Sequence, residues 1–221
     1  MMGRSVSLLA LAGALMAAPW AQAQQVDDLG NMRMNGCTLE PGAVCPKADL
    51  SGAKLAGQDL RGADFSGANL AGADLRHAIL IGVDLSGANL RGAQLSRANM
   101  KSANLREADL TGAVMVGTQA WGIHGANAVF DKVQATGANF DFGRLTRSRW
   151  HQAQLRGASM EMTWVNKASF EGADFTDANL QEVKMNMAKL RHAVMTGASI
   201  KYANFQMVDM EGCTDCPVDW E

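Results

Sequence analysis

Few residues of this 221-residue chain have the types and spacing that chemistry requires. Cys213 and Cys216 form a C-x-x-C pair, a pattern found in redox couples and in one half of a zinc site. A redox pair normally needs a helix N-terminus to lower a thiol pKa, and zinc needs four ligands close together. The sequence indicates neither feature near these cysteines, so a redox protein is only the third hypothesis for function.

The histidines do not form a recognisable catalytic set. They are scattered along the chain at His77, His124, His151 and His192. No Ser–His–Asp set, pair of carboxylates or phosphate-binding loop accompanies them. Catalysis requires a concave pocket in which polar groups converge, and a chain without long insertions has little with which to build one. We therefore expect a protein that is not an enzyme and that uses no cofactor and no metal.

The segments that must position any functional residue repeat every five residues. Every fifth residue from Leu50 to Met210 is large and apolar, except for the small residues Ala120, Gly125 and Ala135. Alanine is common two residues before this central position, Asp or Asn one residue before it, and glycine two residues after it. A period of five fits neither a helix nor a flat strand, and over most of a chain it indicates a solenoid.

The order of residue types within each unit predicts a short strand with one buried face, followed by a turn at the glycine. The central residue and the alanine would fill the interior, while the other three positions would face water. Where the central residue is small, the position two before it is larger, as in Ile123 before Gly125 and Val133 before Ala135. Because interiors are close-packed, we expect the coil to continue through residues 115–135 without a break.

Units such as Ala-Asp-Leu-Arg-Gly and Ala-Asn-Leu-Ala-Gly resemble the pentapeptide repeat family over roughly residues 46–212. The resemblance implies an all-β fold, a right-handed quadrilateral β-helix with four repeats per coil, about 8 coils and a length of roughly 40 Å. Some cytoplasmic members mimic DNA, which requires a strongly acidic surface. This chain has a formal net charge of only −2, so we do not expect it to mimic DNA. The same near-balance of acidic and basic residues predicts no nucleic-acid partner.

The first residues read as a secretory signal peptide. Arg4 precedes a short apolar run, and Ala21-Gln22-Ala23 matches a cleavage site, so residues 1–23 would be removed after Ala23. The run is too short to cross a bilayer well and no later segment qualifies, so we expect no membrane span and a periplasmic or secreted protein. We interpret residues 24–46 as a tether and N-terminal cap, residues 47–211 as the β-helix and residues 212–221 as the C-terminal cap.

The four cysteines lie outside the predicted coils, Cys37 and Cys45 before them and Cys213 and Cys216 after them. A disulfide needs Cα atoms within about 7 Å, and the rod implied by the resemblance holds the two pairs at opposite ends. We therefore expect Cys37–Cys45 and Cys213–Cys216 bonds. They would staple the end caps that a solenoid needs to cover its open ends.

With four repeats per coil, residues 20 apart would stack at about 4.8 Å. The middle repeats carry basic and aromatic side chains at outward positions where other repeats carry Asp, Asn or Gly. The column on one wall and its neighbours are His124, Arg144, Trp164 and Lys184, with Arg147 and Lys167. The preceding face stacks an apolar strip of Phe142, Met162 and Tyr202, with Trp121 close by. These ten residues are the candidate interaction surface.

Two classes of function follow from this surface. The leading hypothesis is a non-enzymatic exported scaffold that binds a partner protein through its flat walls, with the apolar strip as a candidate site for pairing two copies as a homodimer. The alternative is a binder of an anionic envelope glycan, held by Arg144, Arg147, Trp164 and Lys167. Solvated charges and large side chains that cover each other would account for the same residues without any binding role.

Overall fold

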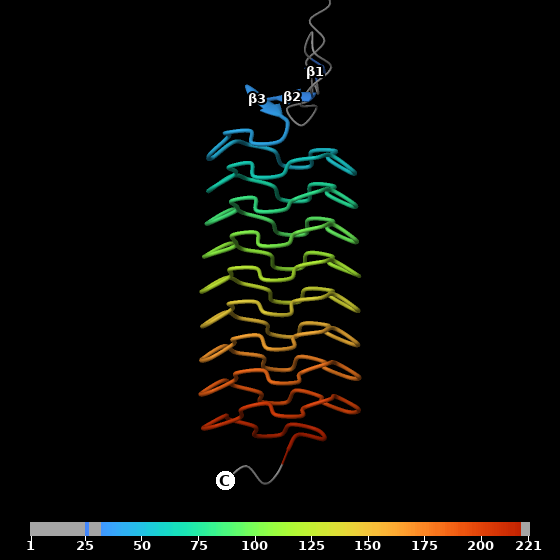
Figure 1. The fold of residues 1–221 in the computed structure, drawn as a ribbon, viewed down its shortest axis with the longest axis vertical. Coiled ribbons are helices and arrows are strands. Elements are labelled where there is room, and N and C mark those ends of the chain that lie inside the picture. The colour runs from blue at the N-terminus through green and yellow to red at the C-terminus, as the bar shows by residue number, and fades with distance from the viewer. Residues whose placement is uncertain (1–24, 27–31, 218–221) are drawn as a thin grey trace, which may run out of the picture.

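The computed structural model describes residues 25–26 and 32–217, and this part of the chain forms a single column of stacked coils without an α-helix (Figure 1). Parallel β-bridges join residues 20 apart, from Val44 with Asp64 to Val194 with Thr214. One coil therefore takes 20 residues and has four sides, one for each five-residue unit. The period of five and the four-repeat coil are as expected from the sequence. In the described part of the chain no helix could cross a membrane.

Backbone hydrogen bonds run between coils along the whole column. In one representative unit, Leu90 N donates to Asp109 O of the following coil at 2.7 Å, and Asn89 N donates to Ala68 O of the preceding coil at 2.9 Å. The turn is closed by Ala93 N, which donates to Leu90 O at 3.0 Å. The strands are thus paired on both sides, which satisfies the backbone groups that a narrow coil cannot pair within itself.

The central and alanine positions form one continuous core, in which residues such as Ala88 and Leu90 are almost completely buried. The bridges continue through residues 115–135, so the expected unbroken coil is confirmed. Ile123 and Val133 are fully buried beside the small central residues. A Cβ at Gly125 would lie 2.6 Å from Leu145 Cδ2, so a larger residue there would require the Leu145 side chain to move.

An aromatic stack fills the core next to this region. The rings of Phe130 and Trp150 are nearly parallel with centroids 3.9 Å apart, and Phe170 lies 5.8 Å beyond Trp150. Trp150 Nε1 donates to Ser148 Oγ at 2.7 Å, and Ser148 Oγ donates to Leu145 O at 2.6 Å. Ser148 occupies an alanine position, so the sequence provides the indole with the partner that a buried N–H requires.

The expectation that all three remaining positions of a unit face water needs correction. The Asp or Asn before the central residue is often half-buried, as in Asp84 and Asn104. Asp84 Oδ1 accepts hydrogen bonds from Ser86 N at 2.8 Å and from Asn104 Nδ2 at 3.0 Å. The side chain closes the turn of its own unit and joins it to the next coil, which explains why Asp and Asn are common there.

The N-terminal end is covered by a small antiparallel sheet in the order β1 (Gln25–Val26), β2 (Met32–Met34) and β3 (Cys37–Leu39). The described residues of the predicted tether and cap thus include three short strands. The turn between β2 and β3 is Asn35-Gly36, with φ of 51° and 80°, which suits a two-residue hairpin. Met34, Cys37 and Leu39 are buried, so this sheet contributes side chains to the core.

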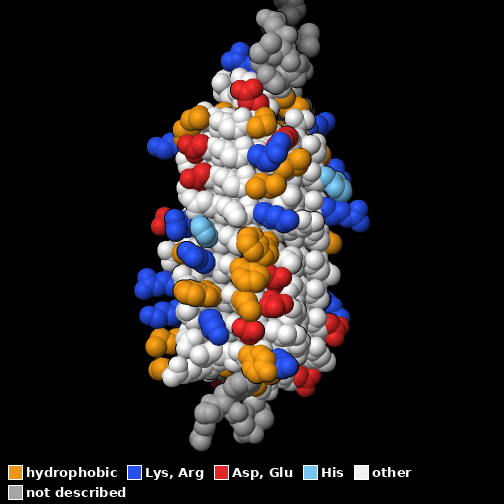
Figure 2. Space-filling view, viewed as in Figure 1, with side chains coloured by type: hydrophobic (Ala, Val, Ile, Leu, Met, Phe, Trp, Pro, Cys, Tyr) orange, Lys and Arg blue, Asp and Glu red, His pale blue; other side chains and the backbone are white. Residues whose placement is uncertain are grey.

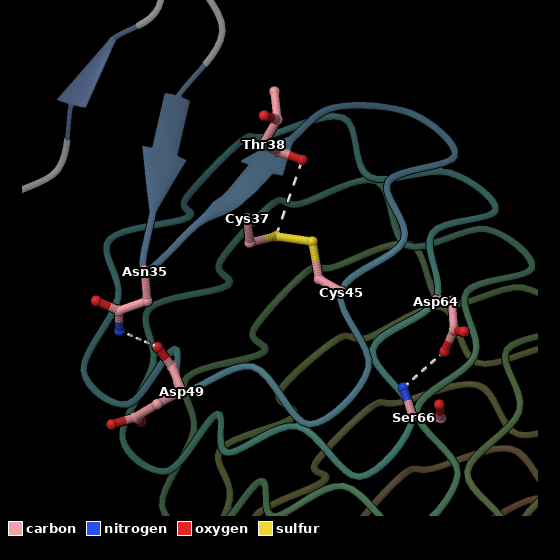
Figure 3. The surroundings of a disulfide bond; sticks show 7 residues. All are labelled: Asn35, Cys37, Thr38, Cys45, Asp49, Asp64 and Ser66. Carbon is pink, nitrogen blue, oxygen red and sulfur yellow. Dashed lines mark hydrogen bonds between the residues drawn. A yellow bond between two sulfur atoms is a disulfide. The ribbon is translucent and has the colours of Figure 1, made fainter.

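The sheet is tied to the first coil at two points (Figure 3). Cys37 is bonded to Cys45 with a Cα–Cα distance of 5.6 Å, and Asn35 Nδ2 donates to Asp49 O at 2.5 Å. At the other end Cys213 is bonded to Cys216. Both bonds have the connectivity expected from the sequence.

The bridges from Val44 to Thr214 extend slightly beyond the predicted β-helix of residues 47–211. The predicted signal peptide, residues 1–23, lies outside the described residues.

Candidate interaction surface

The ten candidate residues lie on one wall of the column and on the two corners that flank it; we call them the middle surface. Successive bridges pair His124 with Arg144, Arg144 with Trp164 and Trp164 with Lys184, so these four form the predicted column. Trp164 is 54% exposed and Arg144 is also exposed, while His124 and Lys184 are half-buried. Figure 2 shows a vertical run of hydrophobic side chains on one face of the column, with Lys and Arg beside it and Asp and Glu close to it.

The basic side chains of the middle surface differ from six arginines elsewhere on the column, which form ion pairs. Six arginines form ion pairs in the described part of the chain, and all lie elsewhere: Arg61, Arg76, Arg91, Arg149, Arg156 and Arg191. Within the same described ranges, no ion pair involves Arg144, Arg147, Lys167 or Lys184. These basic side chains are therefore not held in ion pairs and remain available to a partner.

The sequence explains why these cations have no acidic partner. Four of the pairing arginines contact an Asp 18 residues away, on the adjacent coil. Arg149, which has the same place in its unit as Arg144 and Lys184, pairs with Asp131, 18 residues before it. The residues 18 before Arg144 and Lys184 are Ala126 and Asn166, which carry no charge. The other route, used by Arg61, is an Asp two residues away, and Arg144 and Lys184 have Thr or Asn at the equivalent place.

The positive field acts on the histidine of this wall. The pKa of His124 is lowered from its ordinary value, first by burial and then by the charges of Arg106 and Arg144. Both effects disfavour the imidazolium. His124 therefore presents a neutral ring near pH 7 between two arginines, and it contributes hydrogen-bonding groups to the wall rather than charge.

Aromatic side chains cover the corner that precedes the wall. The rings of Trp121 and Phe142 lie 5.4 Å apart at 49°, and each residue is 45% exposed. Met162 continues the strip as a half-buried side chain. The predicted stacking of Tyr202 on this strip is wrong, because Glu182 occupies the coil between Met162 and Tyr202. Tyr202 instead lies at the end of the column, with Lys201 Nζ 5.0 Å from its ring centroid.

The corner positions of the middle surface have a left-handed backbone. Phe142 has φ of 59°, Met162 of 52°, Arg147 of 59° and Lys167 of 60°. Glycine occupies this conformation freely, whereas other residues pay on the order of 1 kcal/mol each. Gly122, one coil before Phe142 at the same corner, has φ of 66°. The backbone therefore has the same conformation at this corner in each coil, while the residue type changes. These side chains are present at some cost in stability.

The walls are not completely flat, contrary to expectation from the sequence. One shallow hollow of about 320 Å³ is lined by His151, Gln152, Glu171, Gly172 and His192. A second, of about 430 Å³, is lined by Lys101, Gly117, Thr118, Gln119, Trp121, Gly137 and Asn139. Each lies where glycine leaves a corner without a side chain beside larger neighbours.

Among residues 25–26 and 32–217, no three His, Cys, Asp or Glu side chains are placed to hold a metal ion.

The sequence model of the pentapeptide repeat family matches in 8 copies, over residues 48–87, 78–117, 136–172, 153–188 and 187–214. These ranges cover more than half of the chain. The chain is a pentapeptide repeat protein. It therefore has the right-handed quadrilateral β-helix of that family. The matches leave out residues 118–135, the region in which small central residues are compensated by larger neighbours.

Two solved pentapeptide repeat structures resemble this pentapeptide repeat protein. HetL from the cyanobacterium Nostoc sp. strain PCC 7120, described as involved in heterocyst differentiation regulation, is 27% identical, with a TM-score of 0.51, over 78% of this chain and 87% of its own. A trypsin-treated variant of QnrB1, a plasmid-mediated fluoroquinolone resistance protein, is 18% identical, with a TM-score of 0.63, over 77% and 88%. The second likeness concerns the fold alone. The chain has no significant match among curated protein sequences.

Proposed function

We propose that this pentapeptide repeat protein is a non-enzymatic, exported scaffold, periplasmic or secreted, that binds a partner protein through the middle surface. The observation that carries the proposal is the coincidence of unpaired cations and exposed aromatic side chains on one wall. Basic side chains that form no ion pair favour a partner with acidic groups, because complementary potentials speed encounter and fix register. Exposed Trp and Arg are the residue types that most often dominate the binding energy of an interface.

The architecture supports a scaffold of this kind. We infer a rod of about 8 coils, roughly 40 Å long, whose ends are stapled by the two disulfides. Its strands are fixed by bonds to both neighbouring coils, so a partner meets a rigid wall and little order has to be gained on binding. Pentapeptide repeat proteins are generally scaffolds without catalysis.

Pairing of two copies through this wall is disfavoured by charge. An isologous contact places the same patch on both subunits, so the column containing Arg144 and Lys184 would face its own positive charge. A homodimer would have to use the corner strip around Phe142, which is narrow. An acidic partner protein meets neither restriction, so we favour it over self-association.

An anionic glycan is the second candidate, because Trp164 lies between Arg144 and Lys184 on adjacent coils. An exposed aromatic ring between cations can take a sugar ring and its acidic groups. The redox hypothesis has no comparable support, since Cys213 and Cys216 are joined in a bond at the end of the column with no helix beside them in the described residues.

The test uses the purified exported protein, immobilised and incubated with extract of the cell envelope. The double variant Arg144→Glu with Lys184→Glu should lose capture of the partner. The matched control is Arg97→Glu with Lys132→Glu, which makes the same change of charge at exposed corner positions on other sides of the column. It should retain capture. Both variants should melt near the wild-type midpoint, because surface charges without ion-pair partners contribute little to stability.

Capture should weaken as salt is raised, since exposed charges are screened within about 10 Å at 0.1 M. Protease digestion of the extract before incubation should abolish it. Capture that survives digestion and is lost only in the middle-surface variant would favour the glycan instead. Equal capture by both double variants would rule out a role for this wall.

A further inference from the structure

We propose that the hollow beside Trp121 binds an acidic saccharide. This hollow has a volume of about 430 Å³, which is within the range of small-molecule sites. It lies on the wall that precedes the middle surface, where Gln119 and Asn139 are paired in the bridge ladder. The site is therefore distinct from the column containing Arg144 and Trp164, although it shares Trp121 with the middle surface.

The shape of the hollow follows from the residues at its two edges. At one edge the corner carries Gly117 and Gly137, both with φ of 64°. A Cβ at Gly137 would meet nothing within 4 Å, so this edge is open. At the other edge the exposed ring of Trp121 stands out from the surface. A ligand can therefore lie against the wall with one side resting on the indole.

The aromatic edge is held in place before any ligand arrives. Phe142 packs against Trp121 with ring centroids 5.4 Å apart, and Phe142 belongs to the next coil, whose backbone is bonded to the coil of Trp121. The face of an aromatic ring carries negative potential and attracts the weakly positive C–H groups that line one face of a sugar ring. Because the ring is already positioned, little side-chain entropy is lost on binding.

Two amide side chains line the floor and match the hydroxyl groups of a sugar. The Gln119 side chain is exposed, and the described residues provide it with no hydrogen-bond partner. Asn139 donates one N–H to Asp141 Oδ2 at 2.8 Å and accepts from Asp141 N at 3.0 Å, which leaves its second N–H free to donate. An amide group both donates and accepts, and a hydroxyl group does the same.

The charge of the lining selects an acidic ligand. Lys101 is the only charged residue among those that line the hollow. It is exposed and forms no ion pair within residues 25–26 and 32–217. A carboxylate on the sugar would complement it with a charge-assisted hydrogen bond.

The backbone of this wall argues against an extended peptide as the ligand. Gln119 N donates to Ala98 O, and Asn139 N donates to Thr118 O, so the strand groups are already paired with neighbouring coils. A peptide that binds by strand addition requires unpaired N–H and C=O groups at a sheet edge. A sugar uses side-chain amides and an aromatic face, which this hollow provides.

The test is calorimetric titration of the exported protein with two probes, tetragalacturonate and the neutral cellotetraose. Tetragalacturonate should bind, and cellotetraose should bind about tenfold more weakly or not at all. Trp121→Ala should abolish binding of both probes. Lys101→Gln should reduce the affinity for tetragalacturonate to that for cellotetraose.

Two further variants keep the outcome decisive. Gly137→Asn fills the open edge with a residue that tolerates a left-handed backbone, and it should block binding while leaving Trp121 in place. Trp164→Ala, on the neighbouring wall, should bind tetragalacturonate like the wild type. Failure of both probes to bind, a preference for cellotetraose, or wild-type affinity in Trp121→Ala would each overturn the proposal. None of these outcomes affects the test of partner capture with Arg144 and Lys184.

Discussion

Replacement of Trp150 by alanine should destabilise the protein by about 4 kcal/mol. Trp150 is completely buried, stacks on Phe130 at 3.9 Å and meets Phe140 edge-on at 5.4 Å. A buried Trp removes roughly 200 Å² from water, which at about 25 cal/mol per Å² is roughly 5 kcal/mol. The Ala side chain retains part of this, while the cavity and the lost ring contacts add to it, consistent with about 3–5 kcal/mol for such truncations.

Urea unfolding followed by circular dichroism would measure the change, and hydrogen exchange would locate it. Each coil contacts only its neighbours, so protection should fall first in the coils around residues 130–170. Trp150→Phe is the matched control, because it keeps one aromatic ring in the stack and loses the hydrogen bond to Ser148 and part of the buried ring area, for a smaller cost of about 2 kcal/mol. A Trp150→Ala protein as stable as the wild type would refute the burial of this stack and the register of the coil.

Three other predictions concern the corner at Phe142, the N-terminal disulfide and the histidine of the wall. Phe142→Gly should change stability by less than about 1 kcal/mol in a thermal melt, because relief of the left-handed backbone offsets the lost contact with Trp121; a loss above about 2 kcal/mol would mean that this ring is packed as part of the core. Joint replacement of Cys37 and Cys45 by serine should cost on the order of 2 kcal/mol in urea unfolding, and peptide mapping of the oxidised wild type should recover these two cysteines in one linked fragment. The folded pKa of His124 is lowered, so its stabilising contribution is complete above the unfolded value of 6.5 and is lost as the pH falls through the folded value. Melting midpoints at about pH 7 and about pH 5 should therefore differ more in the wild type than in His124→Gln, and an equal difference in both proteins would contradict the assignment.

Much of the fold could be predicted from the sequence, because one short period fixes which residues are inside. The core columns, the unbroken coil around Gly125 and the two disulfide pairs follow from spacing and volume together with the family resemblance. The column from His124 to Lys184 follows from the 20-residue coil. The same rule places Glu182 between Met162 and Tyr202, so the interruption of the apolar strip was readable from the sequence and was missed.

Other features depend on side-chain geometry that a period does not specify. The hollow near Gly137 arises from an open corner on one edge and the orientation of Trp121 on the other. The part-burial of Asp84 depends on hydrogen bonds within its turn and to the next coil. The hairpin at the N-terminal end did have a sequence signal in Asn35-Gly36, which is a typical two-residue turn between strands. The short strands around it gave too little alternation to identify them as strands.

The turn positions differ between the two ends of the column. From Gly52 to Gly92 this position is glycine in every repeat except the one containing His77. From Arg97 onward most repeats carry a side chain there, at the same left-handed φ and therefore at a cost in stability. Neither the core nor the bridge ladder changes between the two parts, so the fold does not require these side chains. Some of them, such as Phe142 and Arg147, lie at the corners of the middle surface, which is consistent with the proposed binding role of that surface.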